Sequence, residues 1–303
     1  MKTNIELLVV GHTAVDLIME IEEFPEPNSS VSANNLKKLK GGAAANVAVV
    51  GATLGLKTGL LTAAGEDFQD SEYKKKFDEL EIDTSATLIA ENETFATAVI
   101  INDKENNQTT YFSWGASKLF KEQNPQESII EKSQAVHLAT GDPIFTLKCA
   151  RIANKLGKTI SFDPGQDLHL YNKETLLEVI KLINILFCNH HEIHMIEEYL
   201  GKPIPEILKM GPEIIIKTCG EKGSYIYTGD EVQHIPANIR KCIDPTGAGD
   251  SYKAGFLSEY LKTGDVINSA KLASSVASFI IEKQGTQTNI PSKEDAIKRM
   301  QKQ

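Results

Sequence analysis

Residues 158–189, KTISFDPGQDLHLYNKETLLEVIKLINILFCN, decide the fold class of this chain because they place one helix between two buried strands. KTISFD (158–163) and ILFCN (185–189) are short apolar runs typical of buried strands, and ETLLEVIKLI (174–183) repeats apolar residues at helical spacing. Two strands joined through a helix form a βαβ unit and pair in parallel. The stretch therefore predicts an α/β protein.

The same alternation continues toward both ends of the chain. Further strands are expected at 5–11, 57–65, 135–140 and 213–218. Further helices are expected at 43–55, 68–80, 144–157, 252–264 and 268–285. Strands that alternate with helices predict a three-layer α/β/α architecture, in which a mainly parallel central sheet carries helices on both faces.

Two regions, 14–40 and 87–113, interrupt this rhythm because they lack a crossover helix. TFATAVIINDKENNQTTYFSW (94–114) alternates apolar and polar residues around a polar turn at 103–107, as a hairpin does. We expect both regions to supply strands of a small β-sheet lid on a single domain spanning 1–303. The ligand site is expected between the lid and the body.

Composition argues against several classes of partner. A formal net charge of −9 over 303 residues argues against nucleic acid or an anionic membrane as the main partner. No segment approaches about 20 continuous apolar residues, and MKTNIELLVVG at the N-terminus is not typical of a signal peptide. The four cysteines form no CxxC pair, so we expect reduced thiols and a cytoplasmic protein.

The strongest functional signal is KCIDPTGAGDSYKAGF (241–256). Gly247, Ala248 and Gly249 begin a helix whose first backbone N–H groups have no partner inside the helix. Glycine lets a ligand approach these groups closely, and the helix dipole favours an anion there. Asp250 then stands where a carboxylate can accept a proton from an attacking hydroxyl. The alternative is a glycine-rich turn with Asp250 as a helix cap.

Two stretches near the N-terminus carry weaker signals. In KLKGGAAANVAVVGATLG (38–55), the backbone near Gly42 and the Asn46 amide could reach a polar ligand, or the small residues could serve close helix–sheet packing. Asp16 in GHTAVD (11–16) could accept two hydrogen bonds from a vicinal diol, or it could be an ordinary loop residue.

Two later stretches are also ambiguous. The turn Thr218-Cys219-Gly220-Glu221-Lys222-Gly223 could hold nucleotide phosphates through backbone N–H groups, or it could be a hairpin turn. Asn189 and Glu192 share a helix face, where Glu192 could organise water around Mg²⁺. The alternative is a capping box with Asn189 at the cap.

In their joint presence and order, these motifs resemble the ribokinase-like, PfkB-type family of carbohydrate and nucleoside kinases. GGAAANVA (41–48) is similar to the family's N-terminal signature, DPTGAGDSYKAGF (244–256) to its C-terminal signature, and NHHE (189–192) to its NxxE motif. The resemblance covers essentially the whole chain. It implies an α/β body with a β lid, ATP with Mg²⁺, and transfer of the γ-phosphoryl group to a primary hydroxyl.

The resemblance also implies roles for individual residues. Asp250 would be the base, and the backbone of Gly247, Ala248 and Gly249 would form the anion hole. The remaining implied contacts are Asp16, Gly42 and Asn46 to sugar hydroxyls, Asn189 and Glu192 to phosphate and Mg²⁺, and Thr218, Gly220 and Gly223 to ATP. Family relatives often use a monovalent cation near the positions of Asp244 and Thr246.

Within the family, GHTAVDLIMEIEEFPEPN, SFDPGQDL and YFSWGAS look closest to the archaeal-type nucleoside kinases. Many sugar kinases of the family carry Asn and Arg after the corresponding Asp-Pro, whereas this chain has Gly165-Gln166-Asp167. The missing Arg disfavours a phosphosugar and suits a neutral acceptor, bound in part by Gln166. Phe112 and Trp114 could pack on a base, although lid or dimer packing would also explain Trp114.

The sequence thus predicts a nucleoside 5′-kinase. One rival is a sugar kinase of the same fold, acting on ribose or fructose, and another is a catalytically silent relative that binds nucleosides. The intact Gly-Ala-Gly-Asp run argues against the silent relative. A homodimer through the lid is compatible with its open strand edges.

Overall fold

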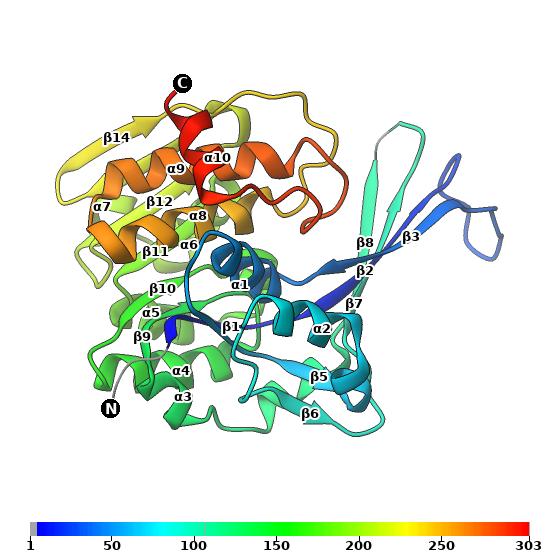
Figure 1. The fold of residues 1–303 in the computed structure, drawn as a ribbon, viewed down its shortest axis with the longest axis horizontal. Coiled ribbons are helices and arrows are strands. Elements are labelled where there is room, and N and C mark those ends of the chain that lie inside the picture. Colours follow the sequence, from blue (N-terminus) through cyan, green and yellow to red (C-terminus); the bar gives the residue numbers. More distant parts are fainter. Residues whose placement is uncertain (1–4, 106, 303) are drawn as a thin grey trace.

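A mainly parallel sheet of eight strands forms the centre of the protein, of which the computed structural model describes residues 5–105 and 107–302 (Figure 1). In order across the sheet, the strands are β14 (Glu231–Ile235), β13 (Ser224–Thr228), β12 (Ile214–Thr218), β11 (Ile185–Asn189), β10 (Thr159–Phe162), β9 (Ser133–Leu138), β1 (Ile5–Val10) and β4 (Thr58–Leu61). Pairing is parallel from β12 to β4 and antiparallel at β13 and β14. The predicted α/β class and mainly parallel sheet are confirmed.

Helices cover both faces of this sheet and make it the middle of three layers. One face carries α3 (Glu127–Glu131), α4 (Pro143–Lys155), α5 (Lys173–Leu182), α6 (His190–Leu200) and α7 (Ile204–Leu208). The other carries α1 (Ala43–Thr53), α2 (Glu72–Glu79), α8 (Ala248–Thr263), α9 (Val266–Ile280) and α10 (Lys293–Met300). Side chains of β1 alternate between the two cores, Leu8 and Val10 facing one and Leu7 and Val9 the other.

A second sheet projects from the body with the order β3-β2-β7-β8 (Figure 1). Its strands are β3 (Asn34–Gly41), β2 (Ala14–Glu20), β7 (Ala96–Asn102) and β8 (Gln108–Ser113). The hairpins β2–β3 and β7–β8 are antiparallel, and the two hairpins meet through parallel pairing of β2 with β7. This is the small sheet expected from the two regions without crossover helices. We refer to it as the lid sheet.

Two expected elements differ in detail. The strand expected at 57–65 is broken at Thr62, and its second part, β5 (Ala63–Gly65), pairs with β6 (Leu88–Ala90) in a sheet of its own. The helix expected at 68–80 is a 3-10 turn, Glu66–Asp70, followed by α2, because Ser71 is extended and caps α2 through its hydroxyl.

Within the described residues, no helix has the length and apolar content needed to cross a bilayer.

The contact between α8 and α9 fixes the helix that carries the strongest motif. Gly255 of α8 lies so close to α9 that an added Cβ would come 2.9 Å from Ala273 Cα and 3.2 Å from Val276 Cβ. The missing side chain therefore lets the two helices approach closely. This close packing holds α8 against the body, and with it the N-terminus at Gly247.

We expect Gly255→Val to lower the free energy of unfolding by about 1–3 kcal/mol, because the new side chain overpacks the α8–α9 contact. Chemical denaturation measures this loss. Lys271→Ala on the exposed side of α9 is the control and should leave stability nearly unchanged. Wild-type stability of Gly255→Val would contradict the close packing.

Candidate active site

The N-terminus of α8 presents free backbone N–H groups at the carboxyl edge of the parallel strands. Gly247 is the N-cap residue, with φ of 79°, and no side chain caps the helix. A Cβ at Gly247 would lie 2.7 Å from Thr286 Cβ, so glycine is required both by conformation and by space. Asp250 therefore does not cap the helix, and the alternative interpretation of this stretch is wrong. An exposed helix start with this geometry favours an anion.

Asp250 is held from α1 by Asn46. The Asn46 side-chain amide donates to Asp250 Oδ2 at 2.9 Å. Asn46 Oδ1 lies 2.8 Å from the Thr286 hydroxyl and accepts from the Gln287 side-chain amide at 2.9 Å. These contacts fix the orientation of Asn46, which is 3% exposed, and therefore fix one oxygen of Asp250.

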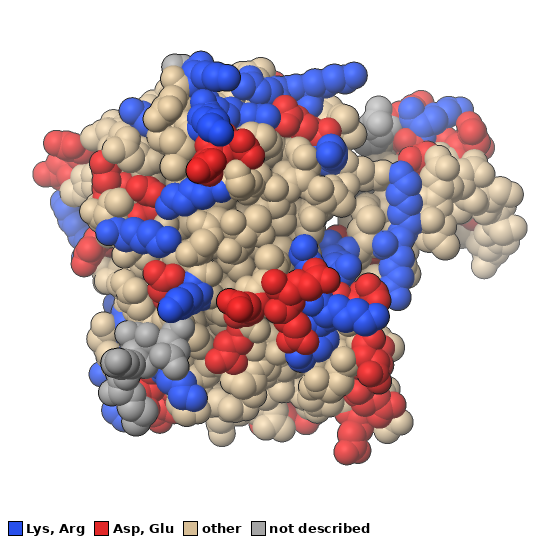
Figure 2. Space-filling view, in the orientation of Figure 1, with Lys and Arg blue, Asp and Glu red and all other residues tan. Residues whose placement is uncertain are grey.

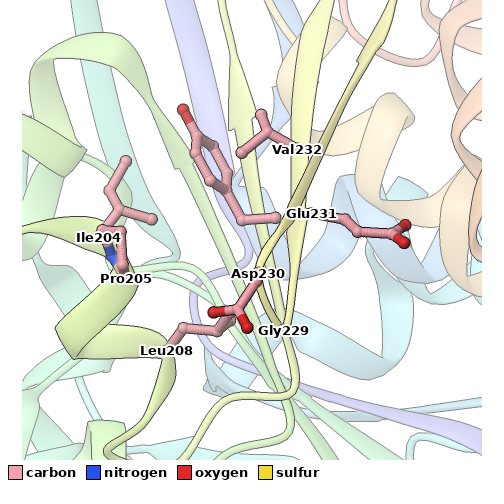
Figure 3. Close-up of a pocket in the computed structure, with 8 residues that line it drawn as sticks. Ile204, Pro205, Leu208, Gly229, Asp230, Glu231 and Val232 are labelled. Atoms are coloured by element: carbon pink, nitrogen blue, oxygen red, sulfur yellow. The ribbon is translucent and has the colours of Figure 1, made fainter.

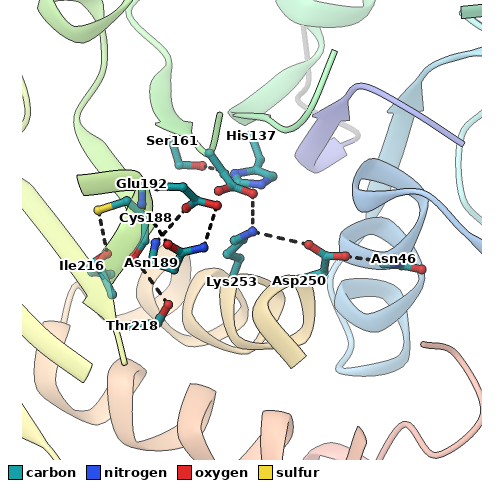
Figure 4. A network of polar contacts seen from close by, with 11 residues as sticks. Asn46, His137, Ser161, Cys188, Asn189, Glu192, Ile216, Thr218, Asp250 and Lys253 are labelled. Atoms are coloured by element: carbon teal, nitrogen blue, oxygen red, sulfur yellow. Dashed lines mark hydrogen bonds and ion pairs between the residues drawn. The ribbon is translucent and has the colours of Figure 1, made fainter. Parts of the chain in front are cut away.

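The second oxygen of Asp250 faces an ammonium group. Lys253 Nζ lies 3.4 Å from Asp250 Oδ1 and also forms a short ion pair with Asp163 Oδ2, just after β10 (Figure 4). Asp163 is 1% exposed, and its other oxygen has no hydrogen-bond partner among the described residues. Burial raises the pKa of Asp163, and Lys253 counteracts this by favouring the ionised carboxylate.

Asp16 lies on β2 of the lid sheet rather than in a loop. Its side chain is so tightly enclosed that a Cβ on Gly41 would come 2.2 Å from Asp16 Oδ2. Burial, together with the negative charges of Asp250 and Asp244, raises the pKa of Asp16 to about 7. Gly42, with φ of 89°, packs against the His12 carbonyl and begins α1. Asp16, Gly42 and the helix bearing Asn46 thus meet where the lid sheet joins the body.

Asn189 and Glu192 form the capping box at the start of α6, as one of the two interpretations predicted. Asn189 Oδ1 accepts from the Glu192 backbone N–H at 2.9 Å, and Glu192 Oε2 accepts from the Asn189 backbone N–H at 2.7 Å. Burial, followed by the charge of Asp163, raises the pKa of Glu192 to about 7. The capping role does not remove Glu192 from the site, because its carboxylate still points toward Lys253 (Figure 4).

The turn from Thr218 to Gly223 is the connection of a hairpin. β12 and β13 pair antiparallel, and Gly220–Lys222 between them forms a 3-10 turn. Gly220 and Gly223 have φ of 55° and 83°, which glycine adopts readily. Thr218 ends β12 beside Asn189, its partner in the parallel ladder. The turn therefore lies at the same edge of the sheet as Asn189, and its contact with ATP stays a prediction.

Phe112 and Trp114 face His12, where the chain leaves β1 for the lid sheet. Their ring centroids lie 5.2 and 4.9 Å from the His12 ring in edge-on geometry. His12 Nε2 lies 3.2 Å from Asp167 Oδ2, and Nδ1 lies 2.9 Å from the Ser117 hydroxyl. Gln166 is exposed, so the residue of DPGQD that points inward is Asp167. The predicted acceptor contacts of Gln166, Phe112 and Trp114 stay predictions.

Sequence reasoning missed Lys253, Asp163, His12 and Asp167 as members of this cluster. A lysine three residues after Asp250 on the same helix was a signal, since positions three apart share a face. The partner of Lys253, however, is 90 residues away in sequence, and only the fold brings it close.

A hollow between α7 and the β13–β14 hairpin is a separate feature (Figure 3). It measures about 120 Å³, which is smaller than the roughly 300 Å³ of the smallest usual ligand pockets. It is lined by Ile204, Pro205, Leu208, Tyr227 and Gly229–Val232. Because β13 runs antiparallel, this hairpin turn lies at the edge of the sheet opposite Asn189 and Thr218.

Similarity to known proteins extends over nearly the whole chain. The model of the pfkB family of carbohydrate kinases matches residues 4–293. A nucleoside kinase of Methanothermobacter thermautotrophicus is 48% identical, over 99% of this chain and 96% of that protein. The crystal structure of Methanocaldococcus jannaschii nucleoside kinase, described as an archaeal member of the ribokinase family, superposes with a TM-score of 0.94 at 44% identity, covering 99% of both chains.

A third similar structure is Burkholderia thailandensis nucleoside kinase in complex with ADP-inosine. It superposes with a TM-score of 0.86 at 26% identity and covers 98% of this chain and 95% of that chain. The chain belongs to the pfkB family of carbohydrate kinases. It is therefore a phosphotransferase with an alcohol group as acceptor, and the predicted resemblance to archaeal-type nucleoside kinases is confirmed.

We expect Asp16→Asn to flatten the pH dependence of stability. The folded protein keeps a proton on Asp16 up to about pH 7, whereas the unfolded chain releases it near the ordinary pKa of 3.8. This stabilising contribution is present in full below pH 3.8 and is lost as the pH rises through about 7, by up to about 4 kcal/mol.

Denaturation at pH 5 and pH 8 measures this difference. Asp230→Asn in the exposed β13–β14 turn is the matched control and should follow the wild-type profile. An Asp16→Asn profile that also follows the wild type would contradict a burial-driven shift.

Proposed function

We propose that this protein is an ATP- and Mg²⁺-dependent nucleoside kinase that phosphorylates the 5′-hydroxyl of inosine, guanosine, cytidine or adenosine. The observation that carries the proposal is the placement of Asp250. Its carboxylate lies at the N-terminus of α8, directly after Gly247, Ala248 and Gly249, and is held by Asn46 and Lys253. A base beside an anion-binding helix start is what phosphoryl transfer to a hydroxyl requires.

The proposed reaction is an in-line displacement. The 5′-oxygen attacks the γ-phosphorus, the bond from that phosphorus to the β-bridging oxygen breaks, and ADP leaves. Asp250 accepts the proton of the 5′-hydroxyl. The backbone N–H groups of residues 247–249 stabilise the negative charge of the phosphoryl group in transfer. The lid sheet and the body are proposed to form a single domain spanning 1–303. Closure of the lid sheet excludes water and limits hydrolysis of ATP.

The acidic residues beside β10 and β11 suit Mg²⁺ held with ATP. Glu192 is a mostly buried carboxylate, and Asp163 has one oxygen without a partner among the described residues. No three His, Cys, Asp or Glu side chains of 5–105 and 107–302 converge on one point, so Glu192 would act mainly through water. Bound Mg²⁺ would neutralise charge on the phosphate oxygens. Asn189, Thr218, Gly220 and Gly223 are proposed to contact ATP.

The acceptor is proposed to bind where the lid sheet meets the body. Asp16, Gly42 and Asn46 would hold the ribose hydroxyls, and an ionised Asp16 can accept from a vicinal diol. Phe112 and Trp114 offer ring faces to a base, and Gln166 offers an amide at the rim. A nucleoside fits this combination of polar and aromatic groups better than a free sugar, which has no base to pack on the rings.

Further properties follow as proposals. Lys and Arg are interspersed with Asp and Glu over the face in Figure 2, which supports small-molecule partners and a cytoplasmic location rather than a nucleic acid or membrane partner.

The exposed Leu36 and Tyr111 on the outer strands of the lid sheet support a homodimer through the lid. Asp244, which accepts from Thr246 N–H and Gly285 N–H, is the proposed neighbour of a monovalent cation.

We expect Asp250→Asn to lower turnover by about 10²-fold or more, because the amide cannot accept the proton. Its melting temperature and its ATP affinity should remain close to wild type, since the substitution is nearly isosteric and leaves the 247–249 N–H groups in place. Steady-state ADP release and calorimetric ATP titration measure the two quantities. Near-wild-type turnover would remove Asp250 from the role of base.

We expect ADP release with ATP and Mg²⁺ for nucleosides and not for free sugars. The acceptors are inosine, guanosine, adenosine, cytidine, ribose, fructose and fructose 6-phosphate. Turnover with ribose or fructose alone would make the chain a sugar kinase and overturn the proposed role of the aromatic rings. Ligand-induced thermal shifts without any turnover would instead identify a catalytically silent nucleoside-binding protein.

A further inference from the structure

Lys253 is the cation in direct contact with the carboxylate of Asp250, and its side chain is only 13% exposed. It extends from α8 between the carboxylates of Asp250 and Asp163 (Figure 4). Burial by itself lowers the pKa of Lys253, but the two carboxylates more than compensate, so the pKa is raised and the ammonium stays charged. The charge of the Lys253 ammonium therefore acts directly on the carboxylate of Asp250, the proposed base.

The two contacts of Lys253 are unequal. The ion pair with Asp163 is short, whereas Nζ lies 3.4 Å from Asp250 Oδ1. Asp163 is almost fully enclosed, with 1% of its surface exposed. Asp163 therefore acts as a fixed anchor that sets how far the ammonium can move toward Asp250.

Asp250 is thus held at both oxygens by residues from different parts of the fold. Asn46 of α1 fixes Oδ2, and Lys253 faces Oδ1. A carboxylate with a neutral donor on one oxygen and a loosely placed cation on the other keeps its charge and a fixed rotamer. It also keeps lone pairs free for a proton.

We propose that Lys253, anchored by Asp163, is a positioning residue that orients the Asp250 carboxylate and keeps it ionised against the negative charges around it. The inference rests on the proposed role of Asp250 as the base. Lys253 needs no contact with substrate to act in this way, because its effect reaches the reaction through Asp250.

Several other titratable groups face this pair. They are Asp16 of β2, His137 of β9, Asp163 after β10, Cys188 of β11 and Glu192 of α6. Burial lowers the pKa of His137 to about 3 and raises the pKa of Cys188, so neither is charged near neutral pH. The remaining groups are carboxylates, and Lys253 lies among them as a cation.

The test compares pH profiles of kcat/KM for the nucleoside, which report ionisations of the free enzyme. The variants are Lys253→Met, Lys253→Arg, Asp163→Asn and the double variant Asp163→Asn/Lys253→Met. Lys262→Met, on the same helix but exposed, is the matched control. Titration of ATP contributes equally to every profile, so differences between profiles belong to the protein.

Loss of the cation should move the acidic limb of Lys253→Met upward by about one pH unit or more. At pH values below the acidic limb, each pH unit by which the limb moves upward lowers kcat/KM by about ten-fold. Asp163→Asn should move the limb downward, because it removes a negative charge and releases the ammonium toward Asp250. Lys253→Arg should keep the limb near the wild-type position, and Lys262→Met should leave it unchanged.

The comparison of Asp163→Asn with the double variant is decisive. Neither protein contains an unpaired buried Asp163 carboxylate, so the comparison remains valid if Lys253→Met alone fails to fold. A limb that lies higher in the double variant supports the proposal, and coinciding limbs overturn it. If the acidic limbs of the two variants coincide and Asp250→Asn is inactive, only the positioning role of Lys253 is overturned. If Asp250→Asn is active, both the assignment of Asp250 as the base and the positioning role of Lys253 are overturned.

Discussion

Parallel pairing of six strands is the constraint on which the site depends. Parallel strands all end at the same edge of a sheet, so β1, β10, β11 and β12 deliver their following residues to one line. Asp163, Asn189 and Thr218 reach this line directly. Helix α8 brings its N-terminus to the same edge because it packs tightly on α9 and α1. Charge, backbone N–H groups and the lid sheet then converge at this edge, although the chain reaches α8 only through the long connection 236–247.

The chemistry of the site depends on an imbalance of charge. Carboxylates from β2, β10, α6 and α8 lie near one another, and Lys253 lies among them. Burial, reinforced by neighbouring negative charge, raises the pKa values of Asp16 and Glu192 to about 7, while Asp163 is tied to the ammonium. Burial and mutual repulsion of these carboxylates cost stability, and Lys253 offsets part of that cost through its contacts with Asp163 and Asp250.

The fold could be predicted from the sequence because buried parallel strands are short apolar runs separated by helices. The break at Thr62 could not, since both sides of it have the same β-type composition and only pairing with Leu88–Ala90 separates them. Gly247 and Asp250 were predicted from local chemistry alone. Lys253, Asp163 and His12 were not, because their partners are distant in sequence. Gln166 was preferred to Asp167, and no local signal in DPGQD tells which of the two turns inward.

The lid sheet consists of two hairpins that leave the body separately. In the first, Ala14 pairs with Gly41, and in the second, Thr97 pairs with Ser113, so each hairpin departs and returns at adjacent points. Neither hairpin sets the spacing of the central sheet. The β2–β7 ladder nevertheless joins the two hairpins into one sheet, so a change of length or register in one hairpin has to be matched by a change in the other.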